Sequence, residues 1–519
     1  MTAGREDWDE VRVAFTERRG RIRTELGGRA RTAALADRGE RNVRQWIDAL
    51  LDRGSFDELG TFAWTANHED QWLPGDGKIG GFGALARRPI TVAGDDVTVK
   101  RATSSFVGND KVHRLFEQAM RAGTPFVYFG ACGGGRIPDI LGATGFTQVR
   151  GYEAIARRRR HIPLVVAIVG DSFGASSLLA GLADFTVQLS GTCLAVTSPR
   201  VIEIATGEQI TPADLGGAAV HAERTGLVDV VVDDADSVVD AVRRYLSYLP
   251  SNADEAAPAG ADCGPVEPDP GLLDIVPRNR RAGYDMVTVI ERVVDPSSFF
   301  PLGTRFGRSL VTGLARIGGL SVGVIANQPS YQAGGLTPDA CDKAVKLMCQ
   351  CDSFGLPIVM LQDTPGFLVG SRPEHDRLVA KANTMQQAFA LASVPKITVL
   401  MRKGFGLGYY AMGGNDVGGD LLYAWAGSEI GFMDPVTGAN VVYADELAEL
   451  PPGERAEHRQ RRAAELAKST AVEGPAGRMK VDEIIDPVDT RPVLVQTVRR
   501  LGRRRSPAPR PLASWPTAW

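Results

Sequence analysis

Two glycine-containing loops follow apolar runs of the length of buried strands. "GDSFGAS" (170–176) comes after "PLVVAIV", and "KGFGLGYYAM" (403–412) comes after "KITVLM". Glycine lets backbone N–H groups approach a ligand closely. A loop that opens a helix also presents free N–H groups and the positive end of the helix dipole, which favours an anion or a developing oxyanion. The sequence therefore predicts two oxyanion-binding sites.

The segment "GDSFG" also matches GxSxG, between an apparent strand and an apparent helix. Under this interpretation Ser172 is a nucleophile, and its base is His221, His375 or His458. The second loop carries Gly404 where the first carries Ser172, so the shared feature is the loop and its amides rather than the hydroxyl. A serine hydrolase remains a minor alternative.

Two further glycine loops, "GACGGGR" (130–136) and "DTPGFLVG" (363–370), suggest either phosphate binding or simple tight turns. Neither contains GxxxxGK[ST] or a full GxGxxG. The basic runs 157–160 and 499–510 could bind phosphates or acidic surfaces, but such runs are more often solvated. The thiols of "CQC" (349–351) are expected to be buried on a helix.

Composition bounds the class of protein. The 519 residues are too many for one core, so two or more domains are expected. A net charge of −3 argues against a nucleic-acid partner, and no apolar run has the length of a membrane span. The start, "MTAGREDWDE", lacks the pattern of a signal peptide, and the six cysteines show no paired CxxC spacing. We expect a cytoplasmic protein with no metal site.

The chain contains a hidden duplication. The Ala-, Pro- and Asp-rich stretch 251–270 is expected to be a linker that divides it nearly in half. Two prolines that precede apolar runs recur 38 residues apart in each half, namely Pro125 and Pro163, then Pro357 and Pro395. Gly174 and Gly406 each follow the second proline by 11 residues. Beyond these glycines the offset between the halves grows from 232 to 236, because Asp184 and Pro199 correspond to Asp420 and Pro435.

Each half therefore supplies a strand, a glycine loop, a second strand, a second glycine loop and a helix. Short apolar strands that alternate with helical stretches indicate an α/β fold with largely buried strands. Two oxyanion sites without an obvious acid–base pair suggest a reaction whose reagents carry their own base. Enolate chemistry on a thioester fits this pattern, because the site needs only to stabilise the enolate oxygen.

The motifs over almost the whole chain resemble one family, the carboxyltransferase β subunits of biotin-dependent acyl-CoA carboxylases of the propionyl-CoA carboxylase type. "PGDGKIGGFGAL", "FVGNDKVHRLFEQAM" and "GGGRIPDIL" follow one another in family order. The second half is more similar still, with "VGVIANQPSYQAGGL", "CDSFGLPIVMLQDTPGFLVG" and "SVPKITVLMRKGFGLGYYAM".

The resemblance implies two tandem crotonase-like (ββα spiral) domains, 1–250 on the acyl-CoA side and 271–519 on the biotin side. It implies a homo-hexamer with active sites at dimer interfaces. It also implies that carboxybiotin releases CO2, that the biotin anion removes the α proton, and that the enolate attacks CO2. The chain has no biotin attachment motif and no ATP-binding carboxylase domain, so biotin would be carried by a separate biotin carboxylase/biotin carrier α subunit.

Carried over by position, the resemblance assigns the amides of Gly174 and Ala175 to the thioester oxygen, and those of Leu407 and Gly408 to biotin. Contacts to substrate are expected from residues of the same loops: Gly133, Gly134, Arg136, Phe173, Gly366, Phe367 and Tyr410.

The chain is a divergent member of this family. The family's first loop reads roughly PCAGGA where this chain has "DSFGAS", with Ala175 in place of the second glycine. The family's second loop reads KAYGGAYDVM, so Leu407 replaces a glycine, and Tyr410 occupies a position linked to acyl-chain choice. Segment 376–384 also departs from the family pattern.

The first hypothesis for function is the transfer of CO2 from carboxybiotin to a short acyl-CoA. An alternative enzyme decarboxylates or transcarboxylates malonyl- or methylmalonyl-CoA, possibly without biotin, and the altered second loop favours it. A non-catalytic subunit of a mixed hexamer is a third interpretation.

Overall fold

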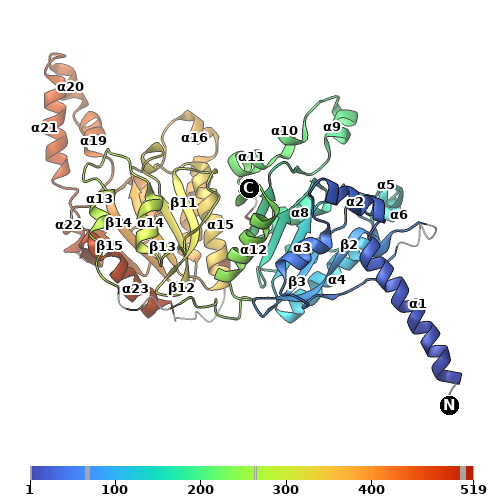
Figure 1. The fold of residues 1–519 in the computed structure, drawn as a ribbon. Coiled ribbons are helices and arrows are strands. Elements are labelled where there is room, and N and C mark those ends of the chain that lie inside the picture. The colour runs from blue at the N-terminus through green and yellow to red at the C-terminus, as the bar shows by residue number, and fades with distance from the viewer. Residues whose placement is uncertain (1–2, 65–70, 262–263, 265, 503–509, 518–519) are drawn as a thin grey trace. The chain divides into compact units, whose positions relative to one another are not determined.

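The computed structural model describes residues 3–64, 71–261, 264, 266–502 and 510–517 (Figure 1). The chain divides into two compact units. Unit 1 ends at Glu255 and unit 2 begins at Ala256, inside the stretch that the sequence suggests is a linker.

Backbone hydrogen bonds hold parts of the stretch 251–270 to each unit. Ala253 donates its N–H to the carbonyl of His161 at 2.7 Å, within unit 1. Gly260 donates to the carbonyl of Gly319 at 2.8 Å, within unit 2. Ala253 is thus bonded within unit 1 and Gly260 within unit 2, while Cys263 lies outside the described residues.

Unit 1 is built on a seven-stranded sheet with the order β1-β2-β3-β4-β5-β7-β9. The strands are β1 (Asp57–Glu58), β2 (Lys78–Leu85), β3 (Arg88–Asp95), β4 (Phe126–Gly130), β5 (Leu164–Ile168), β7 (Phe185–Leu189) and β9 (Val230–Val232). The first three pair antiparallel, and β3, β4, β5, β7 and β9 run parallel.

Helices cover both faces of this sheet, so its central strands are buried on both sides. Rings from α3 (Val43–Leu50) and α12 (Ala235–Tyr248) stack on one face, as Trp46 does on Phe129. Helices α4 (Phe106–Ala122) and α8 (Ala175–Leu182) pack on the other face, where Phe116 meets Phe126. The apolar runs of the sequence thus become the interior of a three-layer unit.

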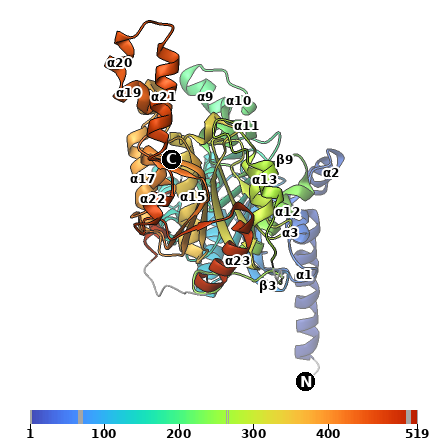
Figure 2. The same cartoon turned by 90° about the vertical axis from the view of Figure 1, so that its left-hand side faces the viewer.

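Unit 2 repeats the arrangement, with the order β10-β11-β12-β13-β14-β15-β17. The strands are β10 (Phe300–Leu302), β11 (Leu310–Ile317), β12 (Leu320–Asn327), β13 (Ile358–Thr364), β14 (Lys396–Phe405), β15 (Leu421–Trp425) and β17 (Glu483–Ile485), and β16 (Glu429–Gly431) pairs with β14. In Figure 2, α15 (Pro338–Phe354) and α17 (Leu378–Leu391) lie on one side of this sheet, and α13 (Gly271–Ile275) and α23 (Thr490–Leu501) lie on the other.

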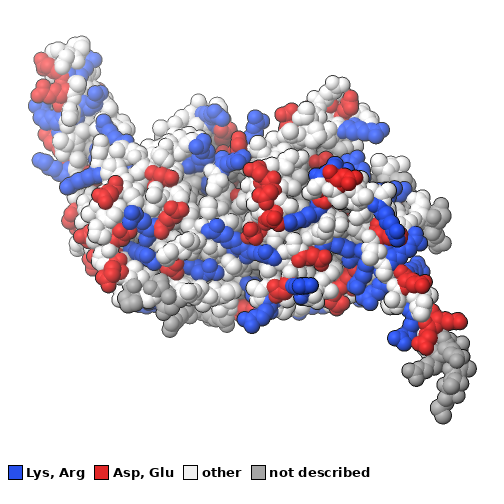
Figure 3. Space-filling model, viewed as in Figure 1, with Lys and Arg blue, Asp and Glu red and all other residues white. Residues whose placement is uncertain are grey.

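The other α-helices and two short strands complete the two units, and α14 (Met286–Val293) packs on the sheet of unit 2 on the same face as α23. Besides α14, they are α1 (Ala3–Glu25), α2 (Arg29–Asp37), α5 (Ile137–Ile140), α6 (Ala143–Phe146), α7 (Tyr152–Ala156), β6 (Ser172–Phe173), β8 (Leu194–Ala195), α9 (Pro199–Thr206), α10 (Pro212–Gly216), α11 (Ala218–Val220), α16 (Ser371–His375), α18 (Gly406–Ala411), α19 (Pro435–Val442), α20 (Ala444–Glu449), α21 (Arg455–Ala467) and α22 (Glu473–Ala476). On the face shown in Figure 3, Lys and Arg alternate with Asp and Glu over both units, without a large area of one sign.

The predicted duplication is confirmed down to single hydrogen bonds. Asp184 accepts the N–H of Leu164 at 2.9 Å, and Asp420 accepts that of Lys396 at 2.9 Å. The strand residues are 232 apart and the aspartates 236 apart, as the sequence requires. The four additional residues of the second half fall between α18 and β15, where α18 ends early and a loop follows.

Matching helix ends show why the same elements form in both units. Helix α4 begins after Ser105, whose side chain accepts the N–H of Gly108, and α15 begins after Thr337, which caps it in the same way. Each helix ends at a glycine in the left-handed conformation, Gly123 in unit 1 and Gly355 in unit 2.

Candidate active site

Two loops of unit 1 lie side by side at the carboxyl ends of β4 and β5. Phe173 donates its N–H to the carbonyl of Cys132 at 2.8 Å, and Gly133 forms a parallel bridge with Phe173. A Cβ built on Gly174 would lie 3.9 Å from the Cα of Gly134. The structure thus brings together Gly133, Gly134, Phe173 and Gly174. The side chain of Phe173 is buried.

The amides at the start of α8 are in different situations. Gly174 has φ +67°, a conformation that favours glycine, and its N–H donates to the carbonyl of Val196 at 3.1 Å. Ala175 is the first residue of α8 and is exposed, and the first amides of a helix have no acceptor within the helix. Ala175 therefore presents an amide that can face a ligand at this point.

A buried carboxylate, that of Asp95, holds the loop 130–136 that follows β4. It accepts the N–H of Ala131 at 2.8 Å and the hydroxyl of Tyr128 at 2.7 Å, and it pairs with the ammonium of Lys78. Burial, reinforced by Asp95, raises the pKa of Tyr128 well above its usual value, so this hydroxyl stays a donor. These contacts fix the position of the loop that follows β4.

Arg136 has a structural role, and its side chain is not open to a substrate. Its side chain is buried, its guanidinium pairs with Asp76, and it donates to the carbonyl of Thr103 at 3.1 Å. Asp76 also accepts the N–H of Gly108 at 2.9 Å. The arginine therefore ties the end of the loop 130–136 to α4, and its side chain is not directed to a ligand.

The equivalent loops of unit 2 are packed more tightly. A Cβ built on Gly408 would stand 2.7 Å from the Cα of Gly366, so only glycine fits at position 408. Leu336 and Phe367 form a parallel bridge, as Ser104 and Gly135 do in unit 1. The structure thus brings Gly366, Phe367 and Gly408 together.

Asn327 occupies the place in unit 2 that Asp95 has in unit 1. It accepts the N–H of Asp363 at 3.0 Å. Asp363 in turn accepts the hydroxyl of Tyr284 at 2.8 Å and the guanidinium of Arg402 at 2.7 Å. The supporting roles of Asp95 and Asn327 were not predicted from the sequence. Their signal would have been that each is a polar residue at the end of an apolar strand, 232 positions apart.

Leu407 and Tyr410 stand at the surface of the second loop. Their side chains are 63% and 39% exposed. Tyr409 lies beneath them: its carbonyl accepts the side-chain amide of Gln362 at 3.0 Å, and its hydroxyl accepts the N–H of Asn415 at 3.1 Å. The leucine that replaces a family glycine is thus directed outward, and the backbone that carries it is anchored from inside.

Ser172 is not placed as a nucleophile. Its side chain is fully buried, and its hydroxyl donates to the carbonyl of Gly170 at 3.2 Å. Both ring nitrogens of His221 are engaged, with the carbonyl of Leu194 at 2.6 Å and the hydroxyl of Thr225 at 3.0 Å. His375 and His458 belong to unit 2.

The expectation of a solvated basic run at 157–160 is wrong for two of its residues. Arg158 and Arg160 are buried and pair with Asp184, at 2.8 and 3.2 Å. The low dielectric of the interior requires a partner for each charge, and Asp184 supplies it. Most of the second basic run, 503–509, lies outside the described residues.

The thiols of Cys349 and Cys351 are buried on α15, as expected. In the part of the chain that the structure describes, no cluster of three or more His, Cys, Asp or Glu could hold a metal ion. Among the same residues, no helix is both long enough and apolar enough to cross a membrane.

Comparisons with known proteins agree with this architecture. The family model described as the carboxyl transferase domain matches residues 35–511. The methylmalonyl-CoA carboxyltransferase 12S subunit of Propionibacterium freudenreichii subsp. shermanii is 34% identical over 93% of this chain and 93% of its own. The propionyl-CoA carboxylase beta chain of Saccharopolyspora erythraea is 34% identical over 96% of this chain and 94% of its own.

A solved structure is similar over nearly the full length. The transcarboxylase 12S crystal structure, with methylmalonyl-coenzyme A and methylmalonic acid bound, covers 98% of this chain and 97% of its own. The TM-score is 0.89 at 33% identity. The predicted α/β fold with two tandem crotonase-like domains is confirmed, and so is the predicted enzyme class, carboxyltransferase. The predicted cofactor and substrate types are those of relatives: a biotin-dependent acetyl-/propionyl-coenzyme A carboxylase beta5 subunit of Mycobacterium tuberculosis is 33% identical over 91% of this chain and 89% of its own, and the solved structure holds methylmalonyl-coenzyme A. The chain belongs to the carboxyl transferase domain family.

Proposed function

We propose that this chain is the carboxyltransferase β subunit of an acyl-CoA carboxylase. It transfers a carboxyl group between biotin, carried by a separate subunit, and the α carbon of a short acyl-CoA. The observation that carries this proposal is the repeated pair of loops. Each unit places a glycine with positive φ, Gly174 or Gly406, directly at the end of a parallel strand and the start of a helix.

Unit 1 is assigned to the acyl-CoA. The N–H of Ala175 donates to the thioester oxygen, and it donates more strongly once that oxygen becomes an enolate. Asp95 and Arg136 hold the neighbouring loop in place through buried contacts. In the carboxylation direction the α proton would pass to biotin once its carboxyl group has left, and the negative charge that develops on the thioester oxygen is stabilised by the fixed N–H of Ala175.

The second loop of unit 2 fits biotin. Gly408 cannot carry a Cβ, and the side chain of Leu407 is directed outward, so the backbone at the start of α18 stays open to a ligand. When bound, biotin supplies or receives the carboxyl group. Within this chain the amides of Leu407 and Gly408 bind and orient its carbonyl oxygen, while Phe367 and Tyr410 border the site.

The assembly is inferred from the relatives. The transcarboxylase 12S structure is described as a hexamer assembly. We infer that this chain likewise forms a homo-hexamer in the cytoplasm. In that assembly unit 1 of one copy faces unit 2 of a second copy across a dimer interface, and a biotin carboxylase/biotin carrier subunit binds to it.

A transfer assay tests the proposal. The purified protein is incubated with methylmalonyl-CoA or malonyl-CoA, with and without a biotinylated carrier protein, and the acyl-CoA products are followed by mass spectrometry. The proposal predicts loss of the carboxyl group only when the carrier is present, and no loss after avidin is added. Decarboxylation without any biotin would contradict it.

One observation favours a second candidate function. The exposed Leu407 stands where the family has glycine, so a biotin bound at the start of α18 would lie beside an additional side chain. A relative that decarboxylates or transcarboxylates malonyl- or methylmalonyl-CoA without biotin would use the same thioester site. Activity of the protein alone, insensitive to avidin, supports this second candidate. Inactivity in both assays, with stable association to a homologous chain, supports a non-catalytic subunit of a mixed hexamer.

A further inference from the structure

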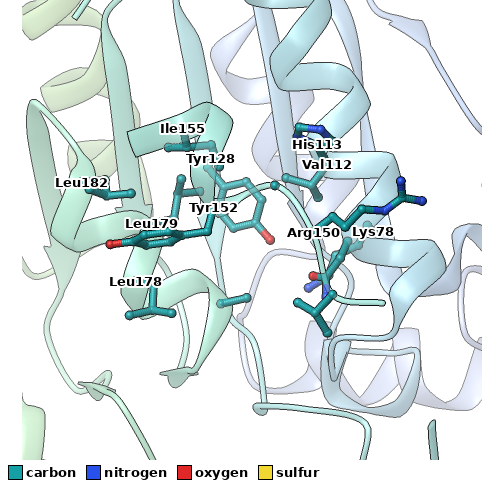
Figure 4. Close-up of a pocket in the computed structure, with 14 residues that line it drawn as sticks. Lys78, Val112, His113, Tyr128, Arg150, Tyr152, Ile155, Leu178, Leu179 and Leu182 are labelled. Carbon is teal, nitrogen blue, oxygen red and sulfur yellow. The ribbon is translucent and has the colours of Figure 1, made fainter. Parts of the chain in front are cut away.

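A pocket of about 120 Å³ lies within unit 1 beside α8 (Figure 4). One face of α8 forms its first wall, through Ala175, Leu178, Leu179 and Leu182. These positions follow the i, i+3, i+4, i+7 spacing of one helix face, so the wall runs continuously from the first turn of α8 to its end.

The rest of the lining comes from α4, α7, β4, β2 and the segment before α7, and it includes the polar side chains of Lys78, Asn109, His113 and Arg150. Val112 projects from α4, Ile155 and Tyr152 come from α7, and the ring of Tyr128 comes from β4 (Figure 4). The hydroxyl of Tyr128 is already bonded to Asp95, so this residue offers the pocket mainly its ring. The walls are therefore predominantly aliphatic and aromatic, the kind of lining that binds hydrocarbon.

Ala175 connects this pocket to the proposed reaction. The residue lines the pocket, and its N–H is the donor assigned above to the thioester oxygen. A thioester oxygen bound there places the acyl chain at the mouth of the pocket, with the apolar face of α8 ahead of it.

We propose that this pocket holds the acyl chain of the substrate and selects chains of about four to six carbons. An apolar cavity of about 150 Å³ is known to hold benzene, so one of about 120 Å³ takes a hydrocarbon of nearly that size. A propionyl group leaves most of this space unfilled. The inference rests on the proposed function, since it assumes that a CoA thioester binds at Ala175.

Binding of a chain-length series tests the pocket without any biotin-carrying partner. Isothermal titration calorimetry of the full chain is carried out with propionyl-, butyryl-, hexanoyl- and octanoyl-CoA. We expect affinity to rise about fourfold for each methylene buried, up to hexanoyl-CoA, and then to level off. Equal affinities for propionyl- and hexanoyl-CoA would overturn the inference while leaving the proposed function intact. Failure of every thioester to bind would overturn both the inference and the proposed function. The two outcomes therefore distinguish one failure from the other.

Two variants move the preference in opposite directions. Val112→Phe fills the pocket, so the ratio of hexanoyl-CoA to propionyl-CoA affinity should fall to about one. Leu182→Ala lengthens the pocket, so octanoyl-CoA should gain a further severalfold over hexanoyl-CoA. The matched control is Val13→Phe on α1, where the side chain is 57% exposed and lies outside the pocket, and it should bind the series like the wild type.

Each of the two variants has a result that would overturn the inference. A folded Val112→Phe protein, by far-UV circular dichroism, that still prefers hexanoyl-CoA would overturn it. If Val112→Phe does not fold, Leu182→Ala decides alone, and an unchanged ratio of octanoyl- to hexanoyl-CoA affinity overturns the inference.

Discussion

Gly408 lies so close to Gly366 that a Cβ added to it would stand only 2.7 Å from the Cα of Gly366. Real Cβ atoms do not approach another atom so closely, so the contact fixes the first turn of α18 against the loop that follows β13. The position of the second-loop amides therefore depends on a contact between two glycine backbones.

Substitution of Gly408 by alanine should separate these two loops. We expect Gly408→Ala to lower carboxyl transfer at least tenfold and to cost about 1–3 kcal/mol of stability, as overpacked positions do. Activity and the thermal midpoint are compared with Gly453→Ala, since a Cβ on Gly453 would meet nothing within 4 Å. Wild-type activity in Gly408→Ala would show that the contact does not position the site.

The repeat offers a natural control for the buried ion pair of unit 1. Lys78 and Asp95 face each other across β2 and β3, and at the equivalent positions of β11 and β12 unit 2 has Leu310 facing Asn327. Asp95→Asn leaves Lys78 buried without its counter-charge, which typically costs about 3–5 kcal/mol. The double variant Lys78→Leu/Asp95→Asn copies the pair of unit 2 and should recover most of that loss.

Urea unfolding of the two single variants and the double variant measures the coupling between Lys78 and Asp95. An exposed substitution, Asp240→Asn, serves as the control and should change the free energy of unfolding little. Additive losses in the double variant would mean that the two side chains act independently.

Lys343 should make stability depend on pH. Burial lowers its pKa from 10.5 to about 7, and its ammonium or amine group donates to the carbonyls of Gly303 at 3.0 Å and Phe306 at 2.7 Å. Between these two values the unfolded chain binds a proton that the folded chain does not. The contribution of Lys343 to stability therefore rises with pH from about 7 to about 10, and it is constant below about 7.

The Lys343→Met variant should lack this dependence. We expect the free energy of unfolding of the wild type to gain up to about 1.4 kcal/mol per pH unit relative to the variant across this window. Urea unfolding at pH 7, 8, 9 and 10 gives the two slopes, with the exposed Lys468→Met as the control. Parallel slopes for wild type and Lys343→Met would contradict the assignment.

Ser172 should be dispensable for chemistry. Its buried hydroxyl donates to the carbonyl of Gly170 in its own loop, so we expect Ser172→Ala to retain carboxyl transfer to within about twofold. Loss of activity with an intact circular dichroism spectrum would instead revive the serine hydrolase interpretation.

Periodicity and spacing were sufficient to predict the duplication and the α/β class, because both are carried by local signals, whereas the crotonase-like domains were implied by the resemblance to the family. Prolines before strands and glycines after them recur in register, and the structure turns each recurrence into the same strand and the same helix end. The division near residue 255 also falls in a stretch that the sequence marks by its composition.

The supports of the candidate site could not be predicted in the same way. Asp95, Asp76 and Asp184 act through partners 36, 60 and 26 residues away, and no local pattern encodes such pairings. For this reason Arg136 looked like a ligand-binding residue and Arg158 looked solvated, although each neutralises a buried carboxylate. The direction of the Gly174 amide likewise depends on Val196, which only the folded loop brings near.

The proposed reaction depends most directly on the N–H of Ala175, and a proline at this position removes that N–H with little disturbance of the helix. Ala175 is the first residue of α8, a position where proline is well tolerated. The same substitution at Ala235, the first residue of α12, is the matched control within unit 1. The decisive measurement is kcat/KM for the acyl-CoA substrate in the biotin-dependent transfer assay. The account predicts a loss of about 10²–10³-fold in Ala175→Pro, the cost of one oxyanion donor, and a near-normal value in Ala235→Pro. A normal kcat/KM in a folded Ala175→Pro protein would contradict it.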